Sequence, residues 1–169
     1  MRPVRGHRRP RDGFFLRAES YFNVATEIER LDAEPAGGAP LIGSYGGVSL
    51  HEQSHGESFL ALANHRFRGH GLYILDEPEA ALSPQRQLTL LSIINDLVEQ
   101  RASQLVIATH SPILMAYPNA RIYRLAANGI DRVAYEDTEH YKITRDLLSS
   151  PERYFKTLFR PLGSDDVDE

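Results

Sequence analysis

The chain has 169 residues, a formal net charge of −4 and no cysteine, so neither a disulfide framework nor a thiolate metal site can form. Its 41% hydrophobic and 25% charged residues are typical of a single globular domain and exclude a chain that is disordered throughout. The sequence contains no apolar run of the roughly 18 residues that a membrane span needs, and we expect a cytoplasmic protein without membrane insertion.

The two ends of the chain carry opposite charge. Five arginines lie within the first eleven residues, and four acidic residues lie near the other end, at Asp165, Asp166, Asp168 and Glu169. The basic end has two interpretations, an arm that contacts nucleic acid phosphates or an unstructured start, and the lack of aromatic residues between the arginines favours the second. We expect residues 1–12 to be a basic tail, 13–150 the folded domain, and 151–169 an extension with an acidic tail.

The first half of the chain predicts one strand and two helices. Phe14-Phe15-Leu16 favours a short strand, and residues 21–31 space their apolar side chains as on one face of a helix. From Asp32 to Gly47 the composition changes to Ala, Pro and Gly, which indicates a loop. Helical spacing resumes after Ser54 and continues to the glycines at 69 and 71. The apolar positions of this second helix are Phe59, Leu62, Ala63 and Phe67.

Two apolar runs, residues 72–75 and 105–109, predict strands, and the Ser83-Pro84 pair between them predicts the start of a helix that ends near Gln100. Strand, helix and strand in this order are typical of a right-handed crossover in a parallel sheet, and we expect both strands to be buried on both faces. The expected buried face of the helix consists of Leu88, Leu91, Ile94, Leu97 and Val98.

The remaining elements are a predicted hairpin and a closing helix. Residues 121–125 and 130–135 favour two antiparallel strands separated by Asn128-Gly129, a dipeptide typical of tight hairpin turns. The helix is expected at residues 139–148. Together these elements predict an α/β fold with a mainly parallel sheet.

Polar residues directly follow the two central strands. Asp76 and Glu77 follow the first strand, and His110 follows the second. Because the carboxyl ends of parallel strands meet at one edge of the sheet, such residues serve a ligand crevice. Hydrolysis of a phosphoanhydride needs one acid for Mg²⁺, a second acid to orient water and a donor to the terminal phosphate. Asp76, Glu77 and His110 match these needs in that order, which predicts nucleotide hydrolysis.

The apolar strand that ends in Asp76-Glu77 resembles the Walker B motif of the ABC-type ATPases. It looks most like the non-transporter branch, which includes the chromosome-maintenance and DNA-repair ATPases of the SMC and RecF kind and predicted bacterial AAA-type ATPases. The resemblance implies that Asp76 acts on magnesium, that Glu77 polarises the attacking water and that His110 is the switch histidine on the terminal phosphate. Ser83, in Ala81-Leu82-Ser83, lies where the family has its D-loop, although the aspartate that often ends that loop is absent.

A second resemblance lies upstream of this strand, at Ser54-His55-Gly56-Glu57-Ser58. Ser54 and Gly56 agree with the family signature Leu-Ser-Gly-Gly-Gln, whereas His55 replaces a glycine and Glu57 replaces the glutamine. The resemblance implies that this segment binds the ATP of a partner subunit, as free N–H groups at a helix start can. The Ser-x-x-Glu spacing also fits a capping box, in which the helix start satisfies its own N–H groups, and both interpretations can hold together.

The family's phosphate-binding loop, Gly-x-x-x-x-Gly-Lys-Ser/Thr, is absent from these residues. The lysines are Lys142 and Lys156, and neither follows the required glycines. We therefore expect a partial P-loop NTPase, the C-terminal part of a three-layer ABC-type ATP-binding domain. In the family's fold the strand that feeds the P-loop lies next to residues 105–109, so its loss should leave that strand with an unpaired edge.

Three functional hypotheses follow. The leading one is an ATP- and Mg²⁺-dependent ATPase, incompetent as this chain alone, whose intact parent hydrolyses ATP as a head-to-tail homodimer. The second is a subunit that lends its signature helix in trans to a P-loop-bearing partner chain. The third is a zinc hydrolase, because residues 51–55 match His-Glu-x-x-His, although Gly46, Gly47 and Gly56 disfavour the helix which that site requires. The sequence does not identify the process that ATP turnover drives.

Overall fold

The computed structural model describes residues 12–33, 40–45, 47, 54–67, 70–100 and 103–159. The predicted basic tail, apart from its last residue, and the acidic end lie outside the described residues. The chain divides into two units, Met1–Leu114 and Met115–Glu169. Within the described residues, no helix has both the length and the apolar character needed to cross a bilayer.

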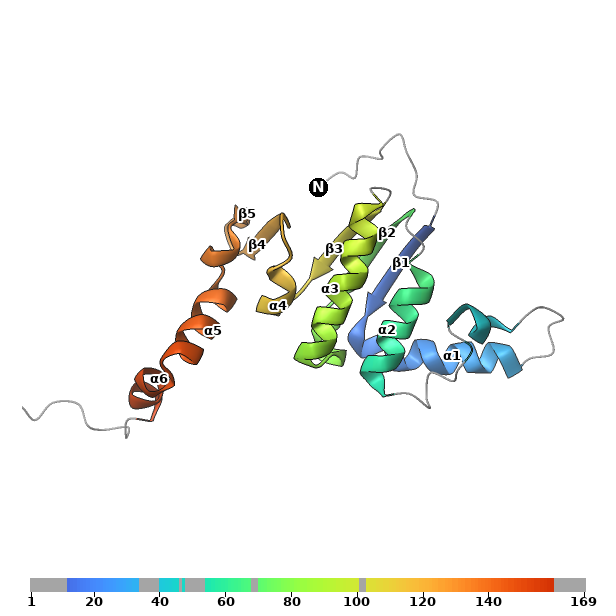
Figure 1. Ribbon diagram of the computed structural model, residues 1–169, viewed down its shortest axis with the longest axis horizontal. Coiled ribbons are helices and arrows are strands. Elements are labelled where there is room, and N and C mark those ends of the chain that lie inside the picture. Colours follow the sequence, from blue (N-terminus) through green and yellow to red (C-terminus); the bar gives the residue numbers. More distant parts are fainter. Residues whose placement is uncertain are drawn as a thin grey trace, which may run out of the picture. The chain divides into compact units, whose positions relative to one another are not determined.

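A parallel sheet organises the first unit (Figure 1). Its strands, in the order β1-β2-β3, are β1 (Asp12–Arg17), β2 (Gly71–Asp76) and β3 (Gln104–Ala108). The register pairs Arg17 with Asp76 and Asp76 with Ala108, so all three strands end at the same edge of the sheet. The predicted α/β class, the three strands and their parallel direction are confirmed.

Three helices of the first unit begin where the sequence predicts them, near residues 21, 55 and 84, whereas the helix at Pro112 and the 3-10 helices were not predicted. The α-helices are α1 (Tyr21–Ala33), α2 (His55–Arg66), α3 (Pro84–Glu99) and α4 (Pro112–Met115), and the short 3-10 helices are η1 (Ala18–Ser20), η2 (Leu41–Tyr45) and η3 (Pro78–Ala81). The Ser83 hydroxyl accepts a hydrogen bond from the Arg86 N–H at 3.4 Å, and Pro84 occupies the first helical position. The predicted Ser83-Pro84 helix start is therefore confirmed.

The hydrophobic core lies between the sheet and the helices α2 and α3, which Figure 1 shows on the same face of the sheet. Tyr73 and Leu75 of β2 are fully buried, and Leu16 of β1 is nearly so. All four predicted apolar positions of α2 are buried, which confirms its predicted face. Burial of each large apolar side chain contributes about 1.5–3 kcal/mol to the stability of the folded state. These side chains therefore stabilise the strands that end at the predicted site.

The predicted buried face of α3 is wrong in part. Ile94 and Leu97 are buried as expected, but Leu88 and Val98 are exposed, and Gln87 and Leu90 are buried instead. Gln87 tolerates burial because its amide donates to the Leu82 carbonyl oxygen at 3.2 Å and its side-chain oxygen accepts from the Ser111 hydroxyl. Apolar spacing alone does not reveal that a glutamine will find such partners.

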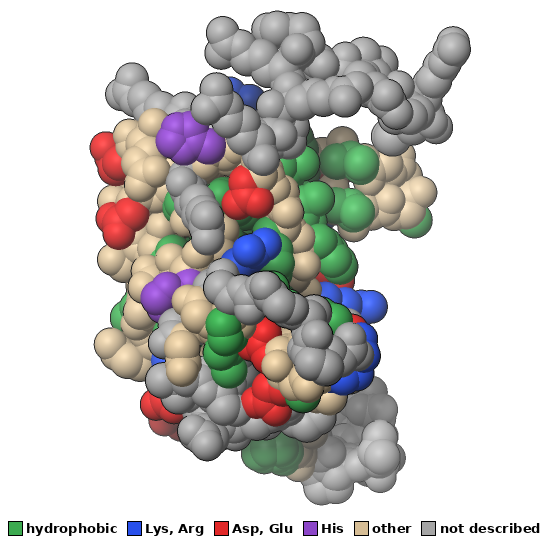
Figure 2. Space-filling view, turned by 90° about the vertical axis from the view of Figure 1, so that its right-hand side faces the viewer, with side chains coloured by type: hydrophobic (Ala, Val, Ile, Leu, Met, Phe, Trp, Pro, Cys, Tyr) green, Lys and Arg blue, Asp and Glu red, His purple; other side chains and the backbone are tan. Residues whose placement is uncertain are grey.

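The expectation of burial on both sheet faces is also wrong for the described residues. Phe15, Ile74 and Val106 form one row across the three strands, and Phe15 is 61% and Val106 48% exposed. Figure 2 shows hydrophobic side chains at the molecular surface. The described part thus has helices on one face of the sheet, whereas a three-layer domain has them on both. As expected, β3 is an edge strand in this part of the chain, paired with β2.

The second unit consists of a hairpin and two helices. Its elements are β4 (Ile122–Ala126), β5 (Gly129–Val133), the 3-10 helix η4 (Tyr135–Asp137), α5 (Glu139–Ser149) and α6 (Pro151–Leu158). The antiparallel hairpin and α5 confirm the prediction, although Ala126 pairs with Gly129, so the turn residues are Ala127-Asn128 and not Asn128-Gly129. The sequence did not predict α6, which lies in the expected C-terminal extension.

Candidate active site

The structure brings the tips of β2 and β3 together at Glu77. This residue has a left-handed backbone, with φ 48° and ψ 51°, a conformation that costs a non-glycine residue on the order of 1–2 kcal/mol. Its N–H donates to the Ala108 carbonyl oxygen at 2.9 Å, beyond the last pair of the β2–β3 ladder. The backbone that carries the predicted catalytic carboxylate is therefore fixed to the neighbouring strand.

The Glu77 and His110 side chains lie close to one another. His110 Nε2 is 3.8 Å from Glu77 Oε1, which is longer than a hydrogen bond, and the two groups form an ion pair only when the imidazole is protonated. The His110 side chain is 73% exposed and the Glu77 side chain is about half exposed. Water screens such a pair, so its contribution to stability is small, but both groups are accessible to a ligand.

Asp76 has a cationic partner that its sequence neighbours do not predict. Arg17 Nε, at the end of β1, lies 3.2 Å from Asp76 Oδ2 and 3.6 Å from a Glu19 carboxylate oxygen. Arg17 and Asp76 are paired residues in the parallel ladder, so the pairing of strands, which is not visible in the sequence, would have been needed to find this contact. The Asp76 carboxylate is a hard oxygen ligand that fits Mg²⁺, which proteins bind through one or two carboxylates together with substrate phosphates.

Two further side chains hold the loop that carries His110. The Glu79 carboxylate accepts hydrogen bonds from the Thr109 hydroxyl at 2.7 Å and from the His110 N–H at 2.6 Å. The Ser111 hydroxyl donates to the buried Gln87 of α3. Glu79 and Gln87 were not among the predicted site residues, because nothing in their local sequence indicates a contact with this loop.

The signature-like segment forms the predicted capping box. Ser54 has an extended backbone, and both its N–H and its hydroxyl donate to Glu57 Oε2, at 3.1 and 2.6 Å. The bond from the Ser54 hydroxyl contributes most to lowering the pKa of Glu57 below its ordinary range. The bond from the Ser54 N–H and the nearby Arg86 guanidinium lower this pKa further. His55 begins α2, and its side chain lies outside the described residues. The phosphate-binding role of Ser54, His55, Gly56 and Glu57 stays a prediction.

Gly56 lies close to the start of α3 and to the turn before it. A Cβ atom at this position would lie 2.7 Å from Arg86 Cδ and 3.0 Å from the Ala81 carbonyl oxygen. Arg86 Nη2 also lies 2.9 Å from Glu57 Oε1. The signature-like segment therefore packs directly against the segment that resembles a D-loop, where the Ser83 hydroxyl serves as the cap of α3.

The structure counts against the zinc hydrolase. Residues 51–53 lie outside the described residues, but the extended backbone of Ser54, with φ −63° and ψ 152°, prevents one continuous helix from residue 51 to 55. His-Glu-x-x-His needs that helix to place both histidines on one face.

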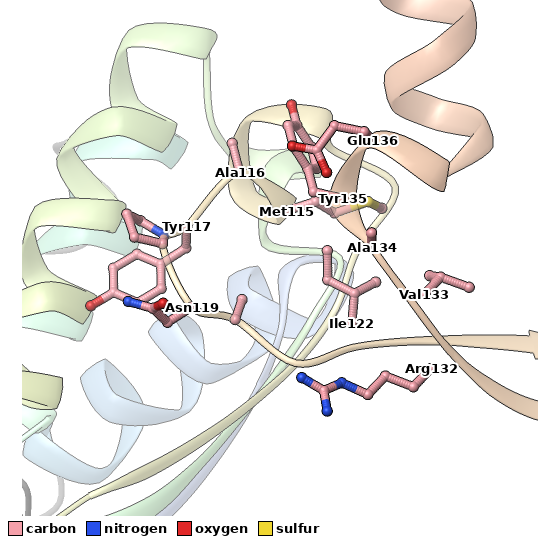
Figure 3. A pocket seen from close by; sticks show the side chains of 12 residues that line it. Met115, Ala116, Tyr117, Asn119, Ile122, Arg132, Val133, Ala134, Tyr135 and Glu136 are labelled. Atoms are coloured by element: carbon pink, nitrogen blue, oxygen red, sulfur yellow. The ribbon is translucent and has the colours of Figure 1, made fainter.

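The second unit contains a hollow of about 490 Å³ (Figure 3). Its lining includes Tyr117, Asn119, Ile122, Arg132, Tyr135 and Glu136. Burial, together with Tyr141 and Glu136, raises the pKa of Tyr135. None of the predicted catalytic residues lines this hollow.

Comparison with known proteins finds similarity to a family model for an AAA domain and to an ABC transporter ATP-binding protein. Residues 40–116, which contain Asp76, Glu77 and His110, match a family model described as "AAA domain, putative AbiEii toxin, Type IV TA system". The chain is 30% identical over 124 residues, 73% of its length, to a putative ABC transporter ATP-binding protein of Geobacter sulfurreducens. That match covers 41% of the relative, so the chain spans less than half of its length. No solved structure matches the chain.

Proposed function

We propose that this chain carries the catalytic side of an ABC-type ATP-hydrolysing site. The observation that supports this most directly is the 3.8 Å separation of His110 Nε2 and Glu77 Oε1 at the tips of adjacent parallel strands, beside Asp76. The similarity to ATP-binding proteins supports the same assignment. In this proposal Asp76 is the magnesium ligand, Glu77 is the base and His110 is the switch histidine.

The geometry suggests how these groups act on ATP. Glu77 accepts a hydrogen bond from the attacking water, and His110 donates to an oxygen of the terminal phosphate, where negative charge is spread in the transition state. Bound Mg²⁺ would supply further charge neutralisation at the phosphates, with Asp76 as its protein ligand. The 3.8 Å between the two side chains leaves each of them able to bond to substrate oxygen atoms instead of to each other.

Such a site also needs a P-loop, which these 169 residues do not contain. We propose that it comes from another segment of a longer polypeptide or from a partner chain, and that the site assembles as a head-to-tail dimer. The edge position of β3 and the exposed row of Phe15, Ile74 and Val106 support this, because unpaired strand edges and apolar faces favour association. The chain alone is then expected not to hydrolyse ATP.

The test is the Glu77→Gln substitution in the ATP-hydrolysing assembly purified from the source cells. We expect kcat to fall by at least about 100-fold while ATP still binds, because an amide cannot accept a proton from water. Glu99→Gln, at the exposed end of α3, is the matched control and should leave kcat unchanged. Full activity of the Glu77 variant would contradict the proposed catalytic role.

A second function, a subunit that acts in trans, is favoured by the signature-like helix start at Ser54. In that case Glu77→Gln would be nearly silent, because Glu77 acts on its own subunit's nucleotide, whereas Ser54→Ala would lower turnover. The intact mass of the native protein separates the two proposals. A mass well above 19.1 kDa would place the P-loop in the same polypeptide, and a mass of 19.1 kDa would favour the subunit in trans.

A further inference from the structure

Glu79 has no role in the function proposed above, yet it accepts two hydrogen bonds from the His110 loop. It lies in η3, the turn that follows Glu77, and its side chain is partly buried. One carboxylate oxygen accepts from the Thr109 hydroxyl at 2.7 Å, and the other accepts from the His110 N–H at 2.6 Å. Hydrogen bonds to an ionised carboxylate are stronger than those between two neutral groups, and here both carboxylate oxygens accept one.

These bonds matter because burial does not fix His110. Its side chain is 73% exposed, and β3 ends at Ala108, so the loop begins where the ladder to β2 stops. The place of the imidazole relative to Glu77 therefore depends strongly on how the Thr109–His110 backbone is held. Glu79 accepts these hydrogen bonds from the turn that follows Glu77, so it connects the two predicted catalytic residues.

The far end of the loop has further contacts, one of which shares the Thr109 hydroxyl with Glu79. The Thr109 hydroxyl accepts from the Ser111 N–H at 3.0 Å, and the Ser111 hydroxyl donates to the buried Gln87 and accepts from the Leu114 N–H at 3.3 Å. These contacts fix Ser111 and the start of α4. These bonds do not involve the His110 N–H, which donates to Glu79.

We propose that Glu79 is a positioning residue that sets the place of His110 relative to Glu77. It does so by accepting the His110 N–H and the Thr109 hydroxyl, and it is not expected to touch the nucleotide. The effect on catalysis rests on the proposed ATP hydrolysis. The effect on the loop does not, so the two can be measured separately.

The first measurement is amide hydrogen exchange of His110 by NMR in the 169-residue chain, which requires no nucleotide. Glu79→Ala should raise the exchange rate by about tenfold or more, because the amide loses its acceptor. Glu79→Gln should keep most of the protection, because its amide oxygen can accept from His110 and its NH₂ group can donate to Thr109. Glu99→Ala is the matched control and should change nothing at His110.

The second measurement is steady-state kinetics in the ATP-hydrolysing assembly. Glu79→Ala should lower kcat by about tenfold or more with little change in the KM for ATP, since a displaced His110 weakens contacts made in the transition state. Glu79→Gln should restore most of the activity, which a loss of general stability would not explain.

The outcomes are distinct. Unchanged exchange at His110 in the alanine variant overturns the proposal, and so does increased exchange with an unchanged kcat. If the wild-type assembly hydrolyses no ATP, the proposed function fails. The His110 exchange rates of the wild type and the Glu79 variants still show whether Glu79 stabilises the loop. If the alanine variant does not fold, Thr109→Val removes the Thr109 hydroxyl, and with it the bonds to Glu79 and to the Ser111 N–H, with little change in shape. It should raise His110 exchange by a smaller factor, and no rise would overturn the proposal.

Discussion

The two units of this chain differ in how they bury apolar side chains. In the first unit, Phe59, Tyr73 and Leu75 are completely buried between a parallel sheet and two helices. In the described part of the second unit no hydrophobic side chain is buried, and Leu125, Leu148 and Phe159 are strongly exposed. A two-stranded hairpin with two short helices has too little surface to enclose a core. The predicted catalytic residues therefore stand on the unit in which packing fixes the backbone.

Contacts in the second unit are mostly between neighbours in the sequence. Phe155 stacks on Phe159 with ring centroids 5.2 Å apart, and Tyr135 lies 4.7 Å from Tyr141. The first unit joins residues that are far apart, as in the Thr109–Glu79 bond across 30 positions. The comparison shows that long-range pairing gives the first unit its shape, while local pairing maintains the elements of the second.

The largest expected effect tests this difference in cores. Phe59→Ala should lower the free energy of unfolding by about 3–5 kcal/mol, because Phe59 is 0% exposed and its loss leaves a cavity. Phe155→Ala in α6, where the side chain is 45% exposed, should cost less than about 1 kcal/mol. Urea unfolding followed by far-UV circular dichroism, with hydrogen exchange to separate the units, measures both. Equal losses would show that the second unit depends on its apolar side chains as much as the first.

A smaller effect is expected at the β1–β2 pairing. A Cβ atom on Gly71 would lie 2.7 Å from the Asp12 carbonyl oxygen, a backbone atom that cannot move without shifting β1. Gly71→Ala should therefore lower the unfolding free energy by about 1–3 kcal/mol. Gly13→Ala is the matched control in the adjacent strand, since its nearest contact would be an ordinary 3.7 Å. If both variants were equally stable in thermal unfolding, close β1–β2 packing would not be what stabilises the first unit.

The smallest effect concerns the exposed capping box at the start of α2. Its hydrogen bonds favour the charged form, so the pKa of Glu57 is lowered in the folded state. The stability that Glu57 contributes is thus fully present above the ordinary range of a glutamate and is lost as the pH falls through the lowered pKa. Ser54→Ala should raise the pKa of Glu57 back toward its ordinary range, as measured by carboxyl-carbon NMR titration.

The control for this titration is the corresponding cap in the second unit. Thr138 caps α5 by accepting the Tyr141 N–H at 3.2 Å, and Thr138→Ala should leave the titration of Glu57 unchanged. An unchanged Glu57 titration in the Ser54 variant would mean that the Ser54 backbone N–H and Arg86, and not the Ser54 hydroxyl, hold the carboxylate in its charged form.

Much of the fold was predictable because its patterns are local. The apolar run before Asp76, the Ser83-Pro84 start of α3 and the face of α2 around Phe59 were all predicted from neighbouring residues and are confirmed. The errors arose where the outcome depended on a distant partner. Gln87 is buried because of Leu82 and Ser111, and Val106 is exposed because the described helices cover the other face of the sheet.

The sequence by itself determined which residues stand at the ends of the central strands, since the change from apolar to polar at Asp76 and before His110 is written into consecutive positions. Only the tertiary structure decided how these residues are held. The Arg17–Asp76 contact, the left-handed backbone of Glu77 and the bonds from the His110 loop to Glu79 all depend on which strand tips become neighbours. The physical reason is that hydrogen bonds and ion pairs act over a few ångströms in space, whatever the separation of their residues along the chain.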